Sequence, residues 1–401
     1  MLRSLFAGIS GLRAHQTMLD VTGNNIANVN TAGFKSSSVQ FQDTLSQVLT
    51  NAGAATATAG GTNPAQIGLG VKVAGISTNF QQGAAQLTNV STDMMISGDG
   101  FFVVDKGGEE MYSRAGAFSF DSLGRLVTPD GGFVQGWAAD ATGAVDTNAA
   151  LTDLTLPVST LMGAAATTTA SFEGNLPTDA AVGDVLTRQI DVYDAAGGSH
   201  ALTVQFTRTA AGWDIAADVA DTTASGTGSI TFNTDGSINT VTLPTLAADA
   251  TVGTSAITLD LNSLTGYAEL ETLAASDQDG QSAGSLQSFT VNADGTVMGS
   301  FSNGLKQAVG QIALASFTNP SGLSKSGNSL YSTTVNSGDP QIGTAGSGGR
   351  GTLTSGSLEM SNVDLSAEFT NLIVAQRGFQ ANSRIITTSD SVLEELVNLK
   401  R

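Results

Sequence analysis

Both ends of the chain carry apolar residues spaced for one face of a long helix. The apolar positions are Leu5, Ile9, Leu12, Leu19 and Ile26 near the N-terminus and Leu365, Leu372, Phe379, Ile386 and Leu393 near the C-terminus. Steps of three, four and seven residues keep side chains on one helix face with a mean period of about 3.5, as in coiled coils. We therefore expect two long terminal helices that pack against each other.

Polar residues interrupt the C-terminal series at Gln376, Ser383 and Asp390. A two-helix unit leaves much apolar surface in water, so we expect the ends to be mobile in the monomer and to order on assembly with other copies. The alternative is an ordinary helical hairpin docked on its own domain. The polar interruptions predict a second, hydrated face on the C-terminal helix.

The composition indicates a β-rich region between the ends and excludes several functions. The 401 residues include 48 Gly and 7 Pro, with 13% charged residues. This mixture favours short strands joined by turns. The chain has no Cys and two His, His15 and His200, so thiol chemistry and disulfides are excluded. A net charge of −19 argues against nucleic acid and anionic membranes as partners. The sequence contains no run of 18 apolar residues, so it predicts no membrane-spanning helix.

Several segments between the helices read as strands. In the flanking parts these are residues 101–105, 117–121 and 312–317, and a hairpin of 288–291 with 296–301 around the turn Asn292-Ala-Asp-Gly295. In the centre they are residues 190–193, 202–206, 213–215 and 229–232, followed by a turn at Asp235-Gly236. The central part is also the acidic part, with about 17 acidic residues against two arginines between Asp146 and Asp279. We interpret it as a separate β domain with a solvated outer face.

The predicted fold is mainly β with long terminal α-helices, in a nested multi-domain order. The N- and C-terminal helices, residues 1–30 and 362–401, pair as a coiled coil. Residues 31–75 form a linker or extended region. Residues 76–145 and 286–361 build one β domain from both flanks, and residues 146–285 form an inserted outer β domain. This nesting places the two chain ends side by side.

No catalytic, cofactor or metal site is predicted. The segment Asp277-Gln-Asp279-Gly280 is faintly similar to a calcium loop, but it lacks the third acid and the terminal Glu of that motif. We interpret it as a polar linker into the flanking β domain. The first residues, Met1-Leu-Arg-Ser-Leu-Phe-Ala-Gly-Ile-Ser10, contain no uninterrupted apolar segment, so we expect no ordinary cleaved signal.

Four motifs resemble those of the flagellar rod and hook protein family. They are Ser4-Leu-Phe-Ala-Gly-Ile-Ser-Gly-Leu12 with Asn24-Asn-Ile-Ala-Asn-Val-Asn-Thr-Ala-Gly-Phe-Lys35, then Ser97-Gly-Asp-Gly-Phe-Phe-Val-Val104, Glu359-Met-Ser-Asn-Val-Asp-Leu365, and Gln376-Arg-Gly-Phe-Gln-Ala-Asn-Ser383. The motif residues carried over near the N-terminus are Asn25, Asn28, Asn30, Thr31, Gly33 and Phe34. For the asparagines, two interpretations stay open: helix termination, or amide pairing with the C-terminal helix or the next subunit. Gly33 is expected to permit a turn and Phe34 to anchor the segment after it.

The resemblance implies a non-enzymatic subunit of an axial homopolymer, with terminal helices in the inner layers and β domains outside. It implies export through the flagellum's own type III apparatus to an extracellular structure, and contacts with distal rod, cap and hook–filament junction proteins. The length and the insertion at 146–285 favour a hook-forming subunit. The alternatives are a distal rod-type subunit and, from another class, a secreted β-rich adhesin or enzyme.

Overall fold

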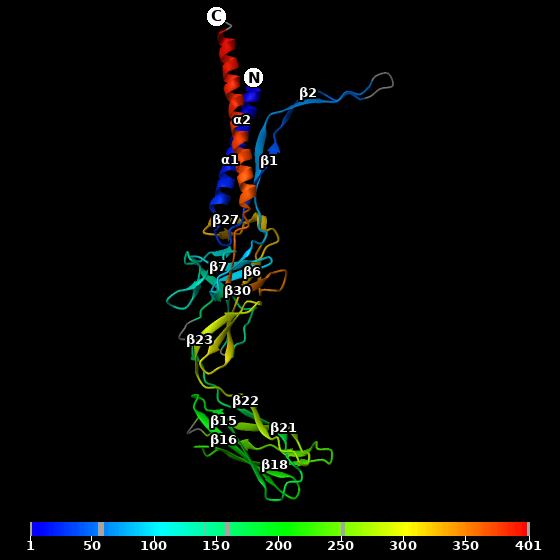
Figure 1. Cartoon of the computed structure of the whole chain (residues 1–401), viewed down its shortest axis with the longest axis vertical. Helices are drawn as coiled ribbons and strands as arrows, with labels where there is room; N and C mark the ends of the chain where they lie inside the picture. Colours follow the sequence, from blue (N-terminus) through cyan, green and yellow to red (C-terminus); the bar gives the residue numbers. More distant parts are fainter. Residues whose placement is uncertain (1, 55–59, 141, 157–160, 250–252, 399–401) are drawn as a thin grey trace.

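The computed structural model describes residues 2–54, 60–140, 142–156, 161–249 and 253–398. The molecule is elongated, with a pair of helices at one end, β domains in the middle and a separate β domain at the other end (Figure 1). The chain enters and leaves at the helical end, so every β domain is nested between the two helices. The expected mainly β fold with packed terminal helices is confirmed.

The two helices are α1 (Leu2–Ala27) and α2 (Leu365–Asn398). They run antiparallel, because Gly11 faces Asn382 while Asn25 bonds to Glu368. The C-terminal helical segment was expected from residue 362, and α2 begins three residues later, at Leu365. Asp364 fixes this start, since its carboxylate accepts hydrogen bonds from the backbone N–H groups of Ser366 and Ala367. Residues 399–401 of the expected helical segment lie outside the described residues.

The region expected as a linker, residues 31–75, contains a two-stranded antiparallel ribbon. Its strands are β1 (Ser37–Asp43) with β4 (Val71–Thr78), and β2 (Ser46–Thr50) with β3 (Ala65–Gly68). The first pair runs beside the helices and the second bends away from the molecule (Figure 1). The phenyl ring of Phe41 packs on the His15 imidazole with centroids 5.8 Å apart, which holds the base of the ribbon on α1.

Two further short pairs join the ribbon and helices to the main body. They are β5 (Ala85–Leu87) with β31 (Ser357–Glu359), and β6 (Met94–Ser97) with β30 (Thr352–Ser355). Each pair combines one strand from before the central domain with one from after it. The chain therefore closes back on itself before α2 begins.

The inner β domain is built around one 14-stranded sheet. Along its main path the strands are β13 (Leu161–Met162), β23 (Gly284–Val291), β24 (Thr296–Phe301), β25 (Lys306–Ile312), β11 (Phe133–Ala138), β7 (Phe101–Asp105), β8 (Glu110–Ser113), β28 (Leu330–Ser332) and β27 (Ser324–Gly327). Off this path lie β9 (Ser119–Phe120), β10 (Leu126–Val127), β12 (Thr152–Asp153), β26 (Leu314–Ser316) and β29 (Gln341–Gly343), with a short 3-10 helix η1 (Pro320–Gly322) after β26.

Strand β7 has an unbroken apolar sequence because it is buried on both faces. Phe102 belongs to one buried cluster, while Phe101 and Val103 belong to another on the opposite face of the strand. Because successive side chains of a strand point to opposite faces, a strand buried on both faces must be apolar at every position. The hairpin expected at 288–301 is present as β23 and β24.

The segment after residue 146, where we expected the inserted domain to start, packs with the inner domain. Leu154 and Leu156 pack in the cluster that contains Phe102 and Ile312, and β13 pairs with β23 of the large sheet. The segment after residue 146 thus completes the inner domain. The acidic residues Asp146 and Asp153 lie on the surface of this segment, while Leu154 and Leu156 are buried.

The outer β domain is a sandwich of two sheets. One follows β15 (Val185–Tyr193), β16 (Ser199–Arg208), β17 (Trp213–Val219), β18 (Ser225–Phe232) and β19 (Ile238–Thr242); the other follows β20 (Thr245–Leu246), β21 (Ile257–Thr265), β14 (Thr169–Asn175) and β22 (Ala274–Gln278). Side chains from both sheets, including Trp213 and Phe172, form a single buried cluster. The turn expected at Asp235-Gly236 joins β18 to β19, with Gly236 at φ 81°.

Two antiparallel chain segments connect the inner and outer domains, paired at Ala165 and Gln281. Asp279 clamps this connection, because its carboxylate accepts the backbone N–H groups of Thr168 and Thr169 at 2.7 and 2.9 Å and also the Thr168 hydroxyl. Partial burial raises the pKa of Asp279, but these hydrogen bonds outweigh it and hold the pKa below its ordinary value. The faint calcium-loop segment therefore supplies a backbone clamp.

We predict that Asp279→Asn destabilises the outer domain at pH 7 by about 1 kcal/mol, since a charge-assisted clamp on an exposed carboxylate is lost. A folded-state pKa below the unfolded value of about 3.9 gives stability that is present above that pH and lost as pH falls through the folded pKa. The difference from the unmodified chain should therefore shrink below about pH 4.

The measurement is thermal unfolding followed by Trp213 fluorescence, with Trp137→Phe in both chains so that only the outer domain reports. Asp277→Asn is the control, because the Asp277 carboxylate accepts only the adjacent Gln278 N–H among the hydrogen bonds found. A stability difference that stays constant from pH 7 to pH 2 would contradict the prediction.

Candidate functional site

The seam between α1 and α2 is made of small residues. Ala14 and Ala375 are buried, and Gly8 and Gly11 lie within van der Waals reach of α2. A Cβ atom added to Gly11 would come within 2.7 Å of the Asn382 side chain. Small residues let two helix backbones approach closely. They are therefore buried in the contact, while the large apolar residues beside them are not fully buried.

The structure places the predicted apolar stripe along one flank of this seam. On α1, the side chains of Leu5, Ile9, Leu12, Leu19 and Ile26 are half-buried. On α2, those of Leu372, Ile386 and Leu393 are half-buried, while Leu365 and Phe379 are exposed. The helices thus pair through a line of residues adjacent to the predicted one, and the predicted residues keep free apolar surface.

Helix α2 carries a second apolar flank that the heptad spacing did not predict. Val374, Ile385 and Val392 are all exposed, with Val374 at 54%. At about 100° per residue they lie on the other side of the seam from Leu372 and Phe379. The signal in the sequence was a second spacing of seven, from Ile385 to Val392. The side of α2 opposite the seam carries mainly exposed polar residues such as Gln380, with Ile373 as an exposed apolar residue among them.

Asn25 joins both chain ends to the ribbon. Its fully buried amide nitrogen donates to the Ser37 carbonyl at 2.8 Å and to the Glu368 carboxylate at 2.9 Å, and its oxygen accepts the Ser37 N–H. One side chain therefore connects α1, β1 and α2. Of the two interpretations left open for the asparagines, pairing with the C-terminal helix describes the contacts of Asn25.

The neighbouring motif residues shape the turn after α1. The Asn28 amide donates to the carbonyl and side chain of Asn24, and Asn28 accepts the Thr31 hydroxyl, which matches helix termination. Asn30 is exposed. These contacts are local, so they fix the chain direction after the helix.

Gly33 and Phe34 bring the N-terminal segment onto the inner domain. Gly33 has φ 69°, and a Cβ there would lie 2.5 Å from the backbone nitrogen of Ala115, so a side chain is excluded by both conformation and space. Its N–H donates to the Glu359 carbonyl at 2.7 Å. The Lys325 ammonium lies 5.1 Å from the centroid of the Phe34 ring.

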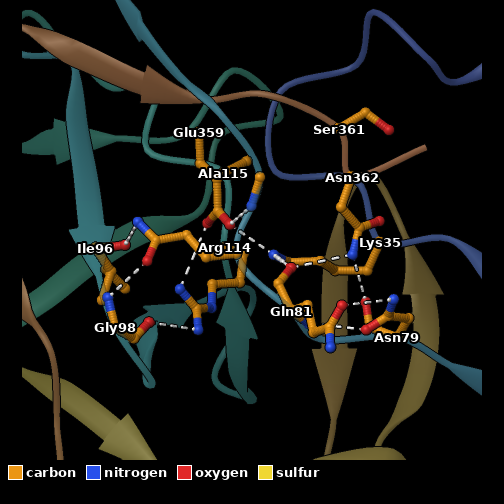
Figure 2. A network of polar contacts seen from close by, with 12 residues as sticks. Lys35, Asn79, Gln81, Ile96, Gly98, Arg114, Ala115, Glu359, Ser361 and Asn362 are labelled. Carbon is orange, nitrogen blue, oxygen red and sulfur yellow. Dashed lines mark hydrogen bonds and ion pairs between the residues drawn. The ribbon is translucent and has the colours of Figure 1, made fainter. Parts of the chain in front are cut away.

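A buried ionic network lies directly beyond this turn (Figure 2). The Glu359 carboxylate lies between two cations, 2.6 Å from Lys35 Nζ and 3.4 Å from Arg114 Nη1. The side chains of Lys35 and Glu359 are fully buried, and that of Arg114 is 2% exposed. The three residues come from the N-terminal segment, the inner sheet and the strand that precedes α2.

Backbone groups complete the network. Lys35 donates to the Gln81 carbonyl at 2.7 Å, Arg114 donates to the Gly98 carbonyl at 2.8 Å, and the Gly83 N–H donates to Glu359 at 2.9 Å. Burial lowers the pKa of Lys35, although the hydrogen bond and charge of Glu359 act in the opposite direction. Burial likewise lowers the pKa of Arg114.

Asn362 fixes the last turn of chain before α2. Its oxygen accepts the Ser36 N–H at 2.8 Å, and its amide donates to the carbonyls of Asn79 and Gln81 (Figure 2). The sequence did not predict the network. The available signal was that Lys35 and Glu359 stand inside the two family motifs as opposite charges in a chain with few charged residues.

Two features of the described residues concern metal-binding groups and membrane-spanning helices. Within them, no group of three or more His, Cys, Asp or Glu side chains could hold a metal ion. None of the helices in these residues is long and apolar enough to cross a membrane. The geometry instead combines a rigid buried junction with exposed apolar surface.

Four families match successive parts of the chain. They are described as "Flagella basal body rod protein" for residues 5–35, "Flagellar hook protein FlgE/F/G D1 domain" for 95–176, "Flagellar basal body protein FlaE D2 domain" for 166–281, and "Flagellar basal body rod FlgEFG protein C-terminal" for 354–399. The matches cover most of both helices, the first part of the inner domain and the outer domain.

Individual relatives match along the whole chain. The "Flagellar hook protein FlgE" of Borreliella burgdorferi is 39% identical, with 100% of both chains covered. The "Flagellar basal-body rod protein FlgG" of Bacillus subtilis is 35% identical, also with 100% of both covered. The crystal structure of Helicobacter pylori flagellar hook protein FlgE2 is similar in fold, with a TM-score of 0.55, 15% identity, and coverage of 69% of this chain and 100% of that one.

Glu359→Ala is predicted to lower the free energy of unfolding of the inner domain by about 3–5 kcal/mol, because it leaves two buried cations unpaired. Urea unfolding followed by Trp137 fluorescence, with Trp213→Phe in every chain, measures this. Lys106→Ala is the control, since its ion pair with Asp130 is partly exposed and should contribute less than about 1 kcal/mol. Equal losses in the two variants would show that the buried network does not hold the junction.

Proposed function

This chain belongs to the flagellar hook and basal-body rod protein family, and we propose that it is a structural, non-enzymatic subunit that polymerises into the flagellar hook. The observation that carries the proposal is exposed apolar surface on both flanks of a paired terminal helix, in a chain similar to a hook protein over its full length. Apolar surface is stable in water only when another surface covers it. Neighbouring copies supply that cover in a polymer.

Leu365, Leu372, Phe379, Ile386 and Leu393, with Leu5, Ile9, Leu12, Leu19 and Ile26, form the first proposed subunit contact. The second flank of Val374, Ile385 and Val392 faces the other way around α2. A helix with contacts on both sides fits a closed layer of helices, in which each one has a neighbour left and right. The polar side with Gln380 then borders a water-filled channel.

The ribbon supports the same proposal. Leu45, Ile67 and Leu69 share one face of β2 and β3 by their register, and all three are exposed, Leu45 at 83%. An isolated two-stranded ribbon is marginally stable in water. We propose that it packs on another copy, and that the helices and ribbon are mobile in the monomer.

In this proposal the helices form the inner wall of a tube and the two β domains form its outer layers. The polar surfaces of the β domains slide as the tube bends, so the tube acts as a universal joint that passes torque from rod to filament. Export through the flagellar type III apparatus without a cleaved signal, and contacts with rod, cap and junction proteins, belong to the same proposal. We propose domain limits at 2–30 with 362–398, 76–165 with 282–361, and 166–281.

A distal rod-type subunit is the second candidate. The full-length similarity to a protein named as a basal-body rod protein favours it. The outer domain at 166–281 argues for the hook, because a sandwich joined by two short segments provides a layer that can move relative to the inner domain. Electron microscopy of the polymer separates the two: curved, flexible tubes support the hook, and straight, rigid tubes support the rod.

The test is Val374→Asp. Because Val374 is exposed in the single chain, we expect a change in the monomer's thermal stability below about 1 kcal/mol. Polymerisation should be abolished, since a charge would be buried at a subunit contact. Sedimentation and electron microscopy measure assembly.

The matched control is Gln380→Asp, which adds the same charge on the polar side of α2 and should still polymerise. If Val374→Asp forms normal tubes, the helical inner wall is wrong. If it melts the β domains, the helices belong to the monomer core.

A further inference from the structure

The outer domain has one arginine, Arg208, that forms no ion pair with any described residue. Of its two arginines, Arg188 lies 2.9 Å from the Glu271 carboxylate. Arg208 forms no ion pair within the described part of the chain. A half-buried cation in a domain of strong net negative charge is a position where an external acidic group is favoured.

Arg208 lies at the tip of the outer domain, remote from the connection to the inner domain. Strands β14 and β21 run parallel and lead away from the Asp279 clamp, so the loops that follow them are distal. The Arg208 guanidinium bridges the loop after β14 and the turn between β16 and β17, since it donates to the Thr178 carbonyl at 2.8 Å and to the Thr209 and Gly212 carbonyls at 2.7 and 2.8 Å. The outer domain is at the far end of the molecule from the helices (Figure 1).

A pocket of about 260 Å³ opens beside this guanidinium, lined by Arg208, Thr178, Trp213, Thr234 and Gly266 among others. Arg208 Nε and Trp213 Nε1 are both buried and have no hydrogen-bond partner in the described residues. The three carbonyl bonds hold the arginine in place without neutralising it. The pocket is therefore lined by a positive charge held in a fixed position.

Carboxylates are abundant on the flat side of the same domain. Asp191 on β15 and Asp214 and Asp218 on β17 are exposed, and their positions alternate with buried residues, so they lie on the outward face of the five-stranded sheet. Two outer domains that meet side to side bring like charges together. A contact through Arg208 can pair one acidic domain favourably with another.

We propose that the Arg208 pocket receives an aspartate or glutamate side chain from the outer domain of a neighbouring copy. This rests on the proposed polymer, and it names a contact of its outer layer. A contact held by a charge pair at one point, between surfaces that otherwise repel, is weaker than the apolar helix layer and is screened by salt. It can therefore exchange without loss of the tube.

The experiment uses Arg208→Lys in the full chain, because a carbodiimide joins a lysine amine to a carboxylate in contact with it. Tubes assembled from equal amounts of unlabelled and ¹⁵N-labelled subunits are treated and analysed by mass spectrometry. We expect a mixed-isotope cross-link from position 208 to an acidic residue of residues 166–281, present in tubes and absent from monomers. Mixed isotopes distinguish contacts between subunits from contacts within one.

Arg188→Lys is the matched control, and it should cross-link to Glu271 within one chain in both tubes and monomers. Because Arg208 also holds two loops together, Thr234→Lys provides a second amine at the pocket with Arg208 intact. Trp213 fluorescence melting verifies that each outer domain is folded.

The proposal is overturned if neither position 208 nor position 234 gives a mixed-isotope cross-link while other lysines in the same tubes do. Failure of the unmodified chain to form tubes would overturn the proposed function, and this inference with it. Tubes with no cross-link at the pocket leave the proposed function standing.

Discussion

The ion pair between Lys35 and Glu359, with Arg114 beside it, is the contact on which the rest of the molecule depends. It joins a residue that follows the first helix to one that precedes the second, more than 300 residues later. Removal of one partner leaves the others charged in a dry site, where an unpaired charge is strongly destabilising. This junction brings the C-terminal end of α1 and the N-terminal end of α2 to one place, where the two helices pair. Asn25 then sets their relative position by bonding to both α2 and β1.

The junction separates two kinds of stability in one chain. On one side of the junction, the β domains have buried cores of their own, with Phe102 and Trp213 almost fully enclosed. On the other side, the helices are in contact through glycine and alanine and leave their larger side chains half-buried or exposed. A close seam of small residues buries little apolar area, so it contributes little stability on its own. In the proposed polymer, contacts with other copies would supply most of the stability of the helical end.

Much of the fold could be predicted from periodicity and turn chemistry, because both are local. The heptad spacing predicted both helices, and strands with their turns were predicted at 101–105 and 288–301. What failed depended on distant contacts. In the sequence, Leu154 and Leu156 stand in an acidic segment. Their burial becomes evident only from their packing in the inner domain. The ribbon at 37–78 was missed because its strands have no buried face to impose an alternating pattern. The ionic junction was missed because no spacing rule relates Lys35 to Glu359.

The two-segment connection at Ala165 and Gln281 has a mechanical consequence. Both segments leave the inner domain at the same place, and β14 and β22, which follow and precede them, are neighbours in one sheet. A pull on the outer domain is therefore shared by two chains side by side, and neither has to unravel for the domain to tilt.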